Sequence, residues 1–425
     1  DAAVLGSGIG SLLRTCEPYP AWRSLRVLNQ SLDEGPWPLP YDVDTLAPMW
    51  LHQPNLPRRP VPSLESTGKR FLEELALLVS DSEAAELTPL WKGFAGSIAG
   101  SLQQRLEHLQ ETRDVADWLE VLWDAGLLQY PAPLPACSTL AMVLRPDPVR
   151  SRNDIAARAT RITTAALEFW DNVRTGQLDV DVDAEGSPQC MRGYLNLFGM
   201  TRVPGRAGDT LKRGARDAQR IVVVANAQYF QVQVVTDSGA LMPPHCLRKA
   251  FQEILERVAA QRAPHYYGTL TAEDRREWAT GHDTLVREGG AATALRMLQN
   301  ALFVVALEAE EGLCTAPERA TRHLLFGSTP NRWYDKALQV VVYPEGACGL
   351  LFDRAALDAS VVLRLAQHIR VRGETDTRPL SAGPDADLSS KEEAPLDVSV
   401  VPVHFRPSPS ALQYVYRAER RVQGL

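Results

Sequence analysis

Two carboxylates flank a single guanidinium where an apolar run ends, at Asp353, Arg354 and Asp358. A guanidinium stays protonated at physiological pH, so Arg354 cannot accept a proton from a hydroxyl. The step from Arg354 to Asp358 is an i, i+4 spacing at a helix start, which favours an ion pair. We therefore predict that the Arg354 guanidinium pairs with Asp358 or Asp353.

A second polar segment, NRWYDK at residues 331–336, lies shortly before this apolar run. Its side chains alternate into the run, which predicts that Trp333 is buried and that Arg332 pairs with a nearby carboxylate. We expect a structural role rather than a catalytic one for this motif. Its members are Asn331, Arg332, Trp333, Asp335 and Lys336.

Strands and helices must hold these residues in place. Residues 339–343 and 346–352 are predicted to form a hairpin, and the turn at 344–346 contains a glycine that can adopt positive φ. A second hairpin is predicted within residues 220–236, reversing at 225–228. Helical spacing of apolar residues predicts the remaining elements. Helices are expected from Ser63 onward and within 84–128, 151–176, 244–262, 271–289, 292–302, 357–369 and 409–422, and a strand at 398–405.

Composition excludes several classes of protein. Of the 425 residues, 45% are hydrophobic and 23% are charged, which is ordinary for a globular protein. The net charge of −7 argues against nucleic-acid binding, and no apolar run is long enough for a transmembrane helix. Six widely spaced cysteines without a CxxC pair indicate a reducing compartment and disfavour a zinc site. The chain begins with Asp1, for which a cleaved targeting peptide is one explanation.

Four motifs, in order, resemble the carnitine/choline acyltransferase family. They are PRRPVPSLESTGKRFL at 57–72, TRVPG at 201–205 followed by Asp209, LTAEDRREWA at 270–279, and NRWYDK at 331–336. The resemblance implies an α/β fold in which a mixed sheet like that of chloramphenicol acetyltransferase is covered by helices. An N-terminal helical and proline-rich extension would precede it. We expect residues 1–62 to form that extension and 63–425 the acyltransferase-like N-terminal domain, with a mobile loop at 371–396.

The resemblance also implies where catalysis should occur. The family's general base is a histidine, and Arg354 stands at its position; Asp358 matches the acidic residue that orients that histidine. The family's second domain, with its coenzyme A and carnitine contacts, has no counterpart here. We expect no cofactor, no metal and no intact catalytic residue. The nearest histidines are His323 and His368, and His368 lies about three to four helical turns past the motif, too far to substitute.

The resulting functional hypothesis is an inactive acyltransferase homologue, kept as a structural or interaction subunit of a larger assembly. The missing half predicts an exposed face that carries Leu351, Phe352 and Arg354 and the helix from Leu357. The proline-rich N-terminal 60 residues are the other candidate contact with a partner. The family resemblance favours mitochondria over another reducing compartment. One alternative is an active acyl-CoA:carnitine or choline O-acyltransferase with an altered base or completed by a second chain. The other is a sensor that binds acyl-CoA or an acyl chain, with coenzyme A as its ligand.

Other candidate sites have simpler explanations. The acidic run at 179–185 could bind a cation, but its alternation with valine favours an edge strand or a solvated loop. Cys137, Cys190 and Cys348 are expected to be buried small hydrophobic residues rather than nucleophiles.

Overall fold

The computed structural model describes residues 47–423, apart from 112–116, 146–153, 216–217, 262, 289, 311–315 and 376–397. By their contacts the residues group into two compact units. Among the described residues, unit 1 comprises 55–111 and 117–127, and unit 2 comprises 47–54 and the described residues from 128 onward. The predicted extension at 1–62 lies outside the described residues as far as residue 46. This grouping differs from the boundary predicted at residues 62 and 63, which stays a prediction.

Unit 1 is helical. Ser63 caps its first helix because the Ser63 hydroxyl accepts a hydrogen bond from the Ser66 amide. A capping box between Ser80 and Glu83 starts the second helix. The helices are α3 (Leu64–Ala76), α4 (Asp81–Ala95), α5 (Ala99–Glu111) and α6 (Trp118–Gln129), the last of which runs into unit 2.

Unit 2 is built on a mixed seven-stranded sheet with the order β1-β8-β7-β6-β4-β5-β9. β4, β6 and β7 are parallel to one another, and the other neighbours pair antiparallel. The seven strands are β1 (Thr139–Leu144), β4 (Arg220–Ala225), β5 (Gln228–Gln233), β6 (Val304–Leu307), β7 (Leu338–Val342), β8 (Cys348–Asp353) and β9 (Val400–Pro402). A separate hairpin joins β2 (Met200–Val203) and β3 (Thr210–Arg213). The predicted α/β fold with a helix-covered mixed sheet is confirmed.

Both predicted hairpins are present. Asn226 and Ala227 adopt positive φ between β4 and β5, and Gly346 does so between β7 and β8. Two consecutive positive φ angles define the tight reversal that matches the twist of antiparallel strands.

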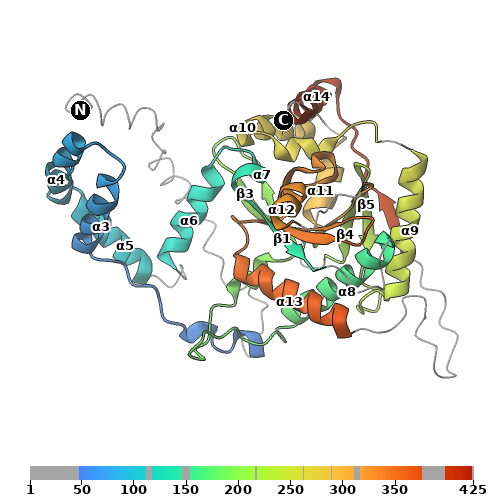
Figure 1. Cartoon of the computed structure of the whole chain (residues 1–425), viewed down its shortest axis with the longest axis horizontal. Helices are drawn as coiled ribbons and strands as arrows, with labels where there is room; N and C mark the ends of the chain where they lie inside the picture. Colours follow the sequence, from blue (N-terminus) through green and yellow to red (C-terminus); the bar gives the residue numbers. More distant parts are fainter. Residues whose placement is uncertain are drawn as a thin grey trace. The chain divides into compact units, whose positions relative to one another are not determined.

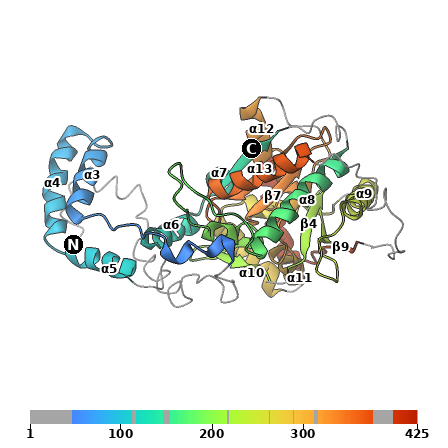
Figure 2. The same cartoon turned by 90° about the horizontal axis from the view of Figure 1, so that it is seen from below.

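Helices cover both faces of the sheet, as Figures 1 and 2 show. α8 lies beside α13 on one side, and α10, α11, α12 and α14 lie on the other (Figure 1). The helices of unit 2 are α7 (Leu134–Cys137), α8 (Ile155–Arg174), α9 (Pro244–Ala260), α10 (Arg275–Arg287), α11 (Ala292–Gln299), α12 (Pro317–Phe326), α13 (Ala359–Thr375) and α14 (Pro409–Gln423). Short 3-10 turns complete the chain at η1 (Pro48–Trp50), η2 (Gln53–Asn55), η3 (Arg192–Asn196), η4 (Tyr267–Ala272) and η5 (Thr329–Asn331).

Three expectations need correction or fall outside the described residues. Residues 371–375 belong to α13 rather than to a loop, and 376–396 lie outside the described residues. Leu351 and Phe352 are buried, so the expected exposed face does not contain them. Their side chains are covered because β8 is paired on both edges, by β1 and by β7, and helices pack on its faces.

Candidate functional site

The predicted site lies at the edge of the sheet where β8 ends. The Asp353 amide bonds the Ala337 carbonyl at 3.0 Å, and the Arg354 amide bonds the Ser138 carbonyl at 2.9 Å. Because β8 runs antiparallel to both neighbours, its last residue meets the start of β1 and the start of β7. This register brings position 354 next to the NRWYDK segment.

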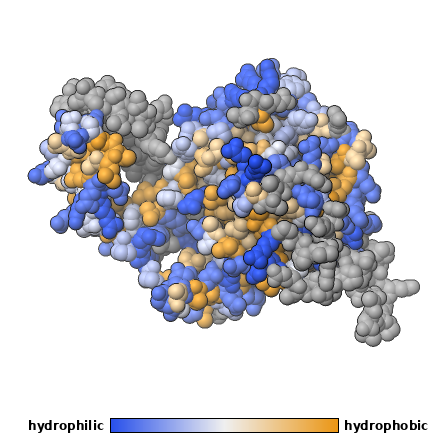
Figure 3. Space-filling view, viewed as in Figure 1, coloured by the Kyte–Doolittle hydropathy of each residue, from blue (hydrophilic) through white to orange (hydrophobic). Residues whose placement is uncertain are grey.

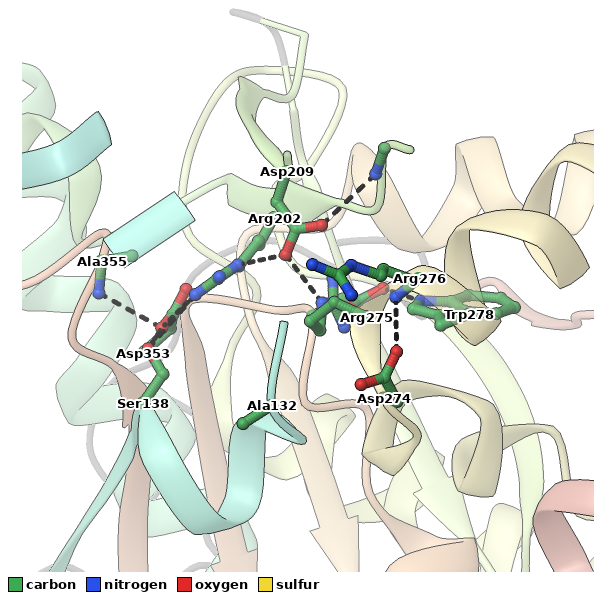
Figure 4. A network of polar contacts seen from close by, with 12 residues as sticks. Ala132, Ser138, Arg202, Asp209, Asp274, Arg275, Arg276, Trp278, Asp353 and Ala355 are labelled. Carbon is green, nitrogen blue, oxygen red and sulfur yellow. Dashed lines mark hydrogen bonds and ion pairs between the residues drawn. The ribbon is translucent and has the colours of Figure 1, made fainter. Parts of the chain in front are cut away.

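A buried chain of polar contacts begins at Asp353 (Figure 4). The Ser138 hydroxyl donates to Asp353 Oδ1, and Arg202 lies 3.5 Å from the same oxygen. Arg202 also donates to Asp209 Oδ2 at 2.6 Å. The Gly205 amide donates a hydrogen bond to Asp209 Oδ1, so the end of the TRVPG segment contacts the carboxylate of the aspartate that follows it.

Arg275, the first residue of α10, links this chain to the NRWYDK motif. Its guanidinium donates to Asp209 Oδ2 and to Asp335 Oδ1, both at 2.7 Å. The Trp278 indole donates to the other Asp335 oxygen at 2.6 Å. Burial raises the pKa of Asp335 to about 6, while Arg275 and Trp278 oppose that shift, so the carboxylate is ionised at neutral pH.

These side chains form one buried ionic network, which we define as Asp353, Arg202, Asp209, Arg275 and Asp335. Each is at most 4% exposed. Three carboxylates face two guanidinium groups, and every member holds at least one oppositely charged partner. Such pairing offsets the large free-energy cost of burying charged groups. Because Arg202, Arg275 and Asp353 belong to β2, α10 and β8, the network also links these three elements.

Arg354 itself is not a member of this network as defined. Its side chain is exposed, and its positive charge contributes to the lowered pKa of Asp358. The larger cause of that lowering is Ser360, whose amide and hydroxyl both donate to Asp358 Oδ1, at 2.9 and 2.8 Å. The predicted ion pair of Arg354 with Asp353 or Asp358 stays a prediction.

The members of the NRWYDK motif are buried, as predicted for Trp333, and their structural role stays a prediction. Trp333 is 2% exposed, and Arg332 is paired with Glu308, the residue that follows β6. The Asn331 amide donates to the Leu307 carbonyl at 2.9 Å and to Glu308 at 3.2 Å. The motif therefore ties the loop before β7 to the end of β6.

Neither nearby histidine reaches position 354. His323 lies 3.2 Å from the Tyr343 hydroxyl, and Tyr343 follows β7 at the sheet edge opposite to Asp353. His368 lies on α13 with Glu168 at 3.8 Å and its ring against Phe169. The expectation that His368 is too distant to substitute stays a prediction.

Lys336 is buried, and its ammonium contacts a hydroxyl and two backbone carbonyls. Its ammonium donates to Thr201 Oγ1 and to the carbonyls of Leu298 and Gln299, at 2.9, 3.2 and 2.9 Å. The two carbonyls belong to the last turn of α11, so Lys336 caps that helix from inside the protein. Burial lowers the pKa of Lys336 to about 7.

A lysine with this pKa makes stability depend on pH. Between pH 7 and the ordinary lysine pKa, the unfolded chain binds a proton that the folded protein has released. The free energy of unfolding should then rise with pH by up to roughly 1.4 kcal/mol per unit. Lys336→Met should remove this slope in urea melts at pH 7, 8 and 9. The exposed Lys69→Met is the matched control, and parallel pH profiles for Lys336→Met and the unmodified protein would contradict the assignment.

The acidic run at 179–185 has structural partners. Asp181 pairs with Arg364 at 2.5 Å and accepts the Tyr194 hydroxyl, which fastens the run to α13. Asp183 accepts the amides of Glu185 and Ser187 at 3.1 and 2.8 Å. Among the described residues, no group of three or more His, Cys, Asp and Glu side chains is arranged to hold a metal ion.

The cysteine expectation is only partly correct. Cys348 is buried, but Cys137 and Cys190 are exposed. Cys137 ends the one-turn helix α7 and its thiol donates to the Ala132 carbonyl at 3.4 Å, and the Cys190 thiol accepts a hydrogen bond from the Gln53 side-chain amide at 3.2 Å. Burial nevertheless raises the pKa of the Cys137 thiol, which makes it a poorer nucleophile.

Sequence reasoning missed the roles of four residues of the site. Ser138 and Glu308 belong to no recognised motif, and their partners are 215 and 24 residues away. Asp209 and Arg275 lie inside quoted motifs, yet nothing in the sequence assigned them to each other. Their charge was the available signal, but it was not specific, because Arg275 lies within five consecutive charged residues at 273–277.

A comparison with known proteins shows which family this sequence matches. Residues 59–425 match the choline/carnitine O-acyltransferase family. The chain therefore belongs to that family. It is 26% identical over 335 residues to a carnitine O-acetyltransferase of Columba livia, covering 75% of this chain and 52% of the relative. It is 27% identical over 332 residues to the Homo sapiens carnitine O-acetyltransferase, with the same coverage.

Choline enzymes match at a similar level. The Homo sapiens choline O-acetyltransferase is 26% identical over 357 residues, covering 80% of this chain and 47% of the relative. The chain thus spans about half the length of the curated relatives it matches. None of the described helices combines the length and apolar character that a membrane span requires.

Proposed function

We propose that this chain is a catalytically inactive acyltransferase homologue that serves as a structural or interaction subunit. The observation that carries the proposal is Arg354, at the position that the family resemblance assigns to the general base. Its guanidinium cannot take a proton from a carnitine or choline hydroxyl. Loss of a positioned base costs roughly 10²- to 10⁴-fold in rate.

Neighbouring groups do not supply a replacement base in the described part of the chain. Asp353 is buried and already accepts from Ser138 and the Ala355 amide, with Arg202 beside it. Asp358 has a lowered pKa, which makes its carboxylate a weaker base than usual. His323 and His368 are held at other parts of the fold, as described above.

The test is an acyl exchange assay with acetyl-CoA and either carnitine or choline, run on the natural full-length protein. We expect no turnover above background. Turnover would favour the alternative of an active O-acyltransferase with an altered base or a second chain. If there is no turnover, calorimetry with coenzyme A in the same preparation separates the sensor alternative from a purely structural subunit, because the sensor should give heat of binding and the structural subunit should give none.

Arg354→His is expected to leave the 425-residue chain inactive. Residue 354 is exposed to water, and a base contributes little where substrate is neither positioned nor shielded. The exchange assay checks this, with Arg354→Ala as the control for any effect of losing the guanidinium. Transfer by the histidine variant above that control would show that positioning is supplied elsewhere.

The proposal extends to a protein partner, with mitochondria as the expected location. Support comes from exposed apolar side chains of unit 1, where hydrophobic residues are visible at the surface in Figure 3. They lie on the helices α3 to α5 or in the turns between them, and are Phe71, Leu77, Leu78, Leu90, Phe94, Ile98 and Leu102. Exposed apolar groups at this density favour an interaction surface. Native pull-down with mass spectrometry should recover a partner from the unmodified protein. The double variant Leu77→Glu with Leu78→Glu should no longer bind this partner, whereas the control Leu363→Glu, on α13, should still bind it. A clean monomer in native extract would count against a partner.

A further inference from the structure

A short segment at residues 47–54 packs into unit 2 before the chain enters unit 1. We call this segment the strap. Met49 and Trp50 are 0% and 2% exposed, although the strap forms only the short turns η1 and part of η2. The Met49 amide donates to the carbonyl of Gly176, just after α8, at 3.1 Å. In Figures 1 and 2 the strap, drawn in blue, lies beside the green loop that follows α8.

Gly176 makes this close approach possible. Its φ is +68°, and a Cβ atom added there would lie 2.6 Å from the Ala47 side chain, so a larger residue would be strained and would displace the strap. The strap contributes no strand to the sheet. It can therefore leave its site while the strands stay paired, which is the behaviour of a segment that opens locally rather than with the whole fold.

A relay of contacts leads from the strap to α13. The Gln53 side-chain oxygen accepts the Met191 amide at 2.9 Å, and the Met191 sulfur accepts the Asp181 amide at 3.3 Å. Asp181 pairs in turn with Arg364 of α13, which also donates to the Asp179 carbonyl at 2.7 Å. Each step joins two segments that are far apart in the sequence or lie at opposite ends of the loop at 176–191.

We propose that the strap is a releasable device that controls how firmly α13 is held. While the strap is docked, Met49 fixes one end of the loop at 176–191 and Gln53 fixes the other. When the strap leaves, both ends lose these contacts, and Asp181 is no longer held in place opposite Arg364. Because α13 is the helix that follows Arg354 in the chain, the state of the strap would reach the candidate site.

Hydrogen exchange measured by mass spectrometry on the full chain tests this device. Trp50→Ala removes the buried anchor of the strap, and we expect amide exchange to quicken roughly tenfold in the strap, in residues 176–191 and in the first turns of α13. Exchange in α10 and α14, which the relay does not reach, should stay unchanged. Leu51→Ala is the matched control, because that side chain lies in the strap but is 55% exposed, and it should alter exchange nowhere.

Gln53→Ala is a second variant that leaves the buried anchor in place. It removes the contact with Met191, so the loop at 176–191 and α13 should exchange faster while Met49 and Trp50 stay protected. Faster exchange confined to the strap in Trp50→Ala, or no change at all, would refute the relay to α13. Faster exchange spread equally over α10 and α14 would show that the strap opens only with unit 2 as a whole, and would overturn the proposal.

Discussion

Replacing Arg275 by methionine should lower the free energy of unfolding by about 3 to 5 kcal/mol. The guanidinium is shared by Asp209 and Asp335, at 2.7 Å from each. Without it, Asp209 keeps Arg202, but Asp335 keeps only the Trp278 indole. A buried carboxylate would then lack a cation, and this accounts for most of the expected loss. Urea or guanidinium melts at pH 7.5 measure it.

Arg206→Met is the matched control for this prediction. Arg206 also contacts an aspartate through Nε, with 3.1 Å to Asp283, but its side chain is 66% exposed. Exposed pairs contribute about 0 to 1 kcal/mol, so this variant should be nearly neutral. If Arg275→Met and Arg206→Met cost the same, the network does not stabilise the fold as argued.

The cost of Arg275→Met should also depend on pH. Asp335 already has a pKa raised to about 6, and loss of the neighbouring cation raises it further. A raised carboxyl pKa means that the folded protein takes up a proton more readily than the unfolded chain as pH falls. The variant therefore regains stability below its new pKa, and its deficit should be smaller at pH 5.5 than at pH 8. A deficit that widens on acidification would contradict this assignment.

Trp333→Ala should cost about 3 to 5 kcal/mol, the usual range for a buried aromatic residue. Its ring packs against Tyr229, Trp278 and Phe405, with centroids 5.8, 6.3 and 6.1 Å away. Removing it leaves a cavity between the sheet and α10 that these rigid rings cannot readily fill. Trp123→Ala is the control because that side chain is 51% exposed. A loss below about 1 kcal/mol for Trp333→Ala in a denaturant melt would show that the packing is wrongly assigned.

Local signals predicted the elements around the site well. The glycine of the β7–β8 turn and the apolar runs on either side determine that hairpin, and Ser63 and the spacing of leucines determine the start of α3. These features depend on residues close together in sequence, so they can be inferred without a tertiary fold. The beginning of α10 was placed too early because η4 occupies residues 267–272, where helical spacing continues without an α-helix.

The partners within the site could not be predicted in the same way. Arg332 needed a carboxylate, and the sequence could not say that Glu308 supplies it, because that pairing depends on β6 and β7 lying side by side. The prediction that Leu351 and Phe352 are exposed was wrong for a related reason. Their burial depends on β1, which pairs with β8 across more than 200 residues of chain.

The distance in sequence between Ser138 and Asp353 has a consequence for the order of folding. These residues are 215 positions apart, and the hydrogen bond between them closes nearly half of the chain into one loop. Contacts of this span are entropically expensive to form early, so β1 should dock onto β8 after the central parallel strands have assembled. Interactions that form after the rate-limiting step of folding determine the unfolding rate of a protein rather than its folding rate. The edge that carries Arg354 would therefore act mainly on the lifetime of the native state.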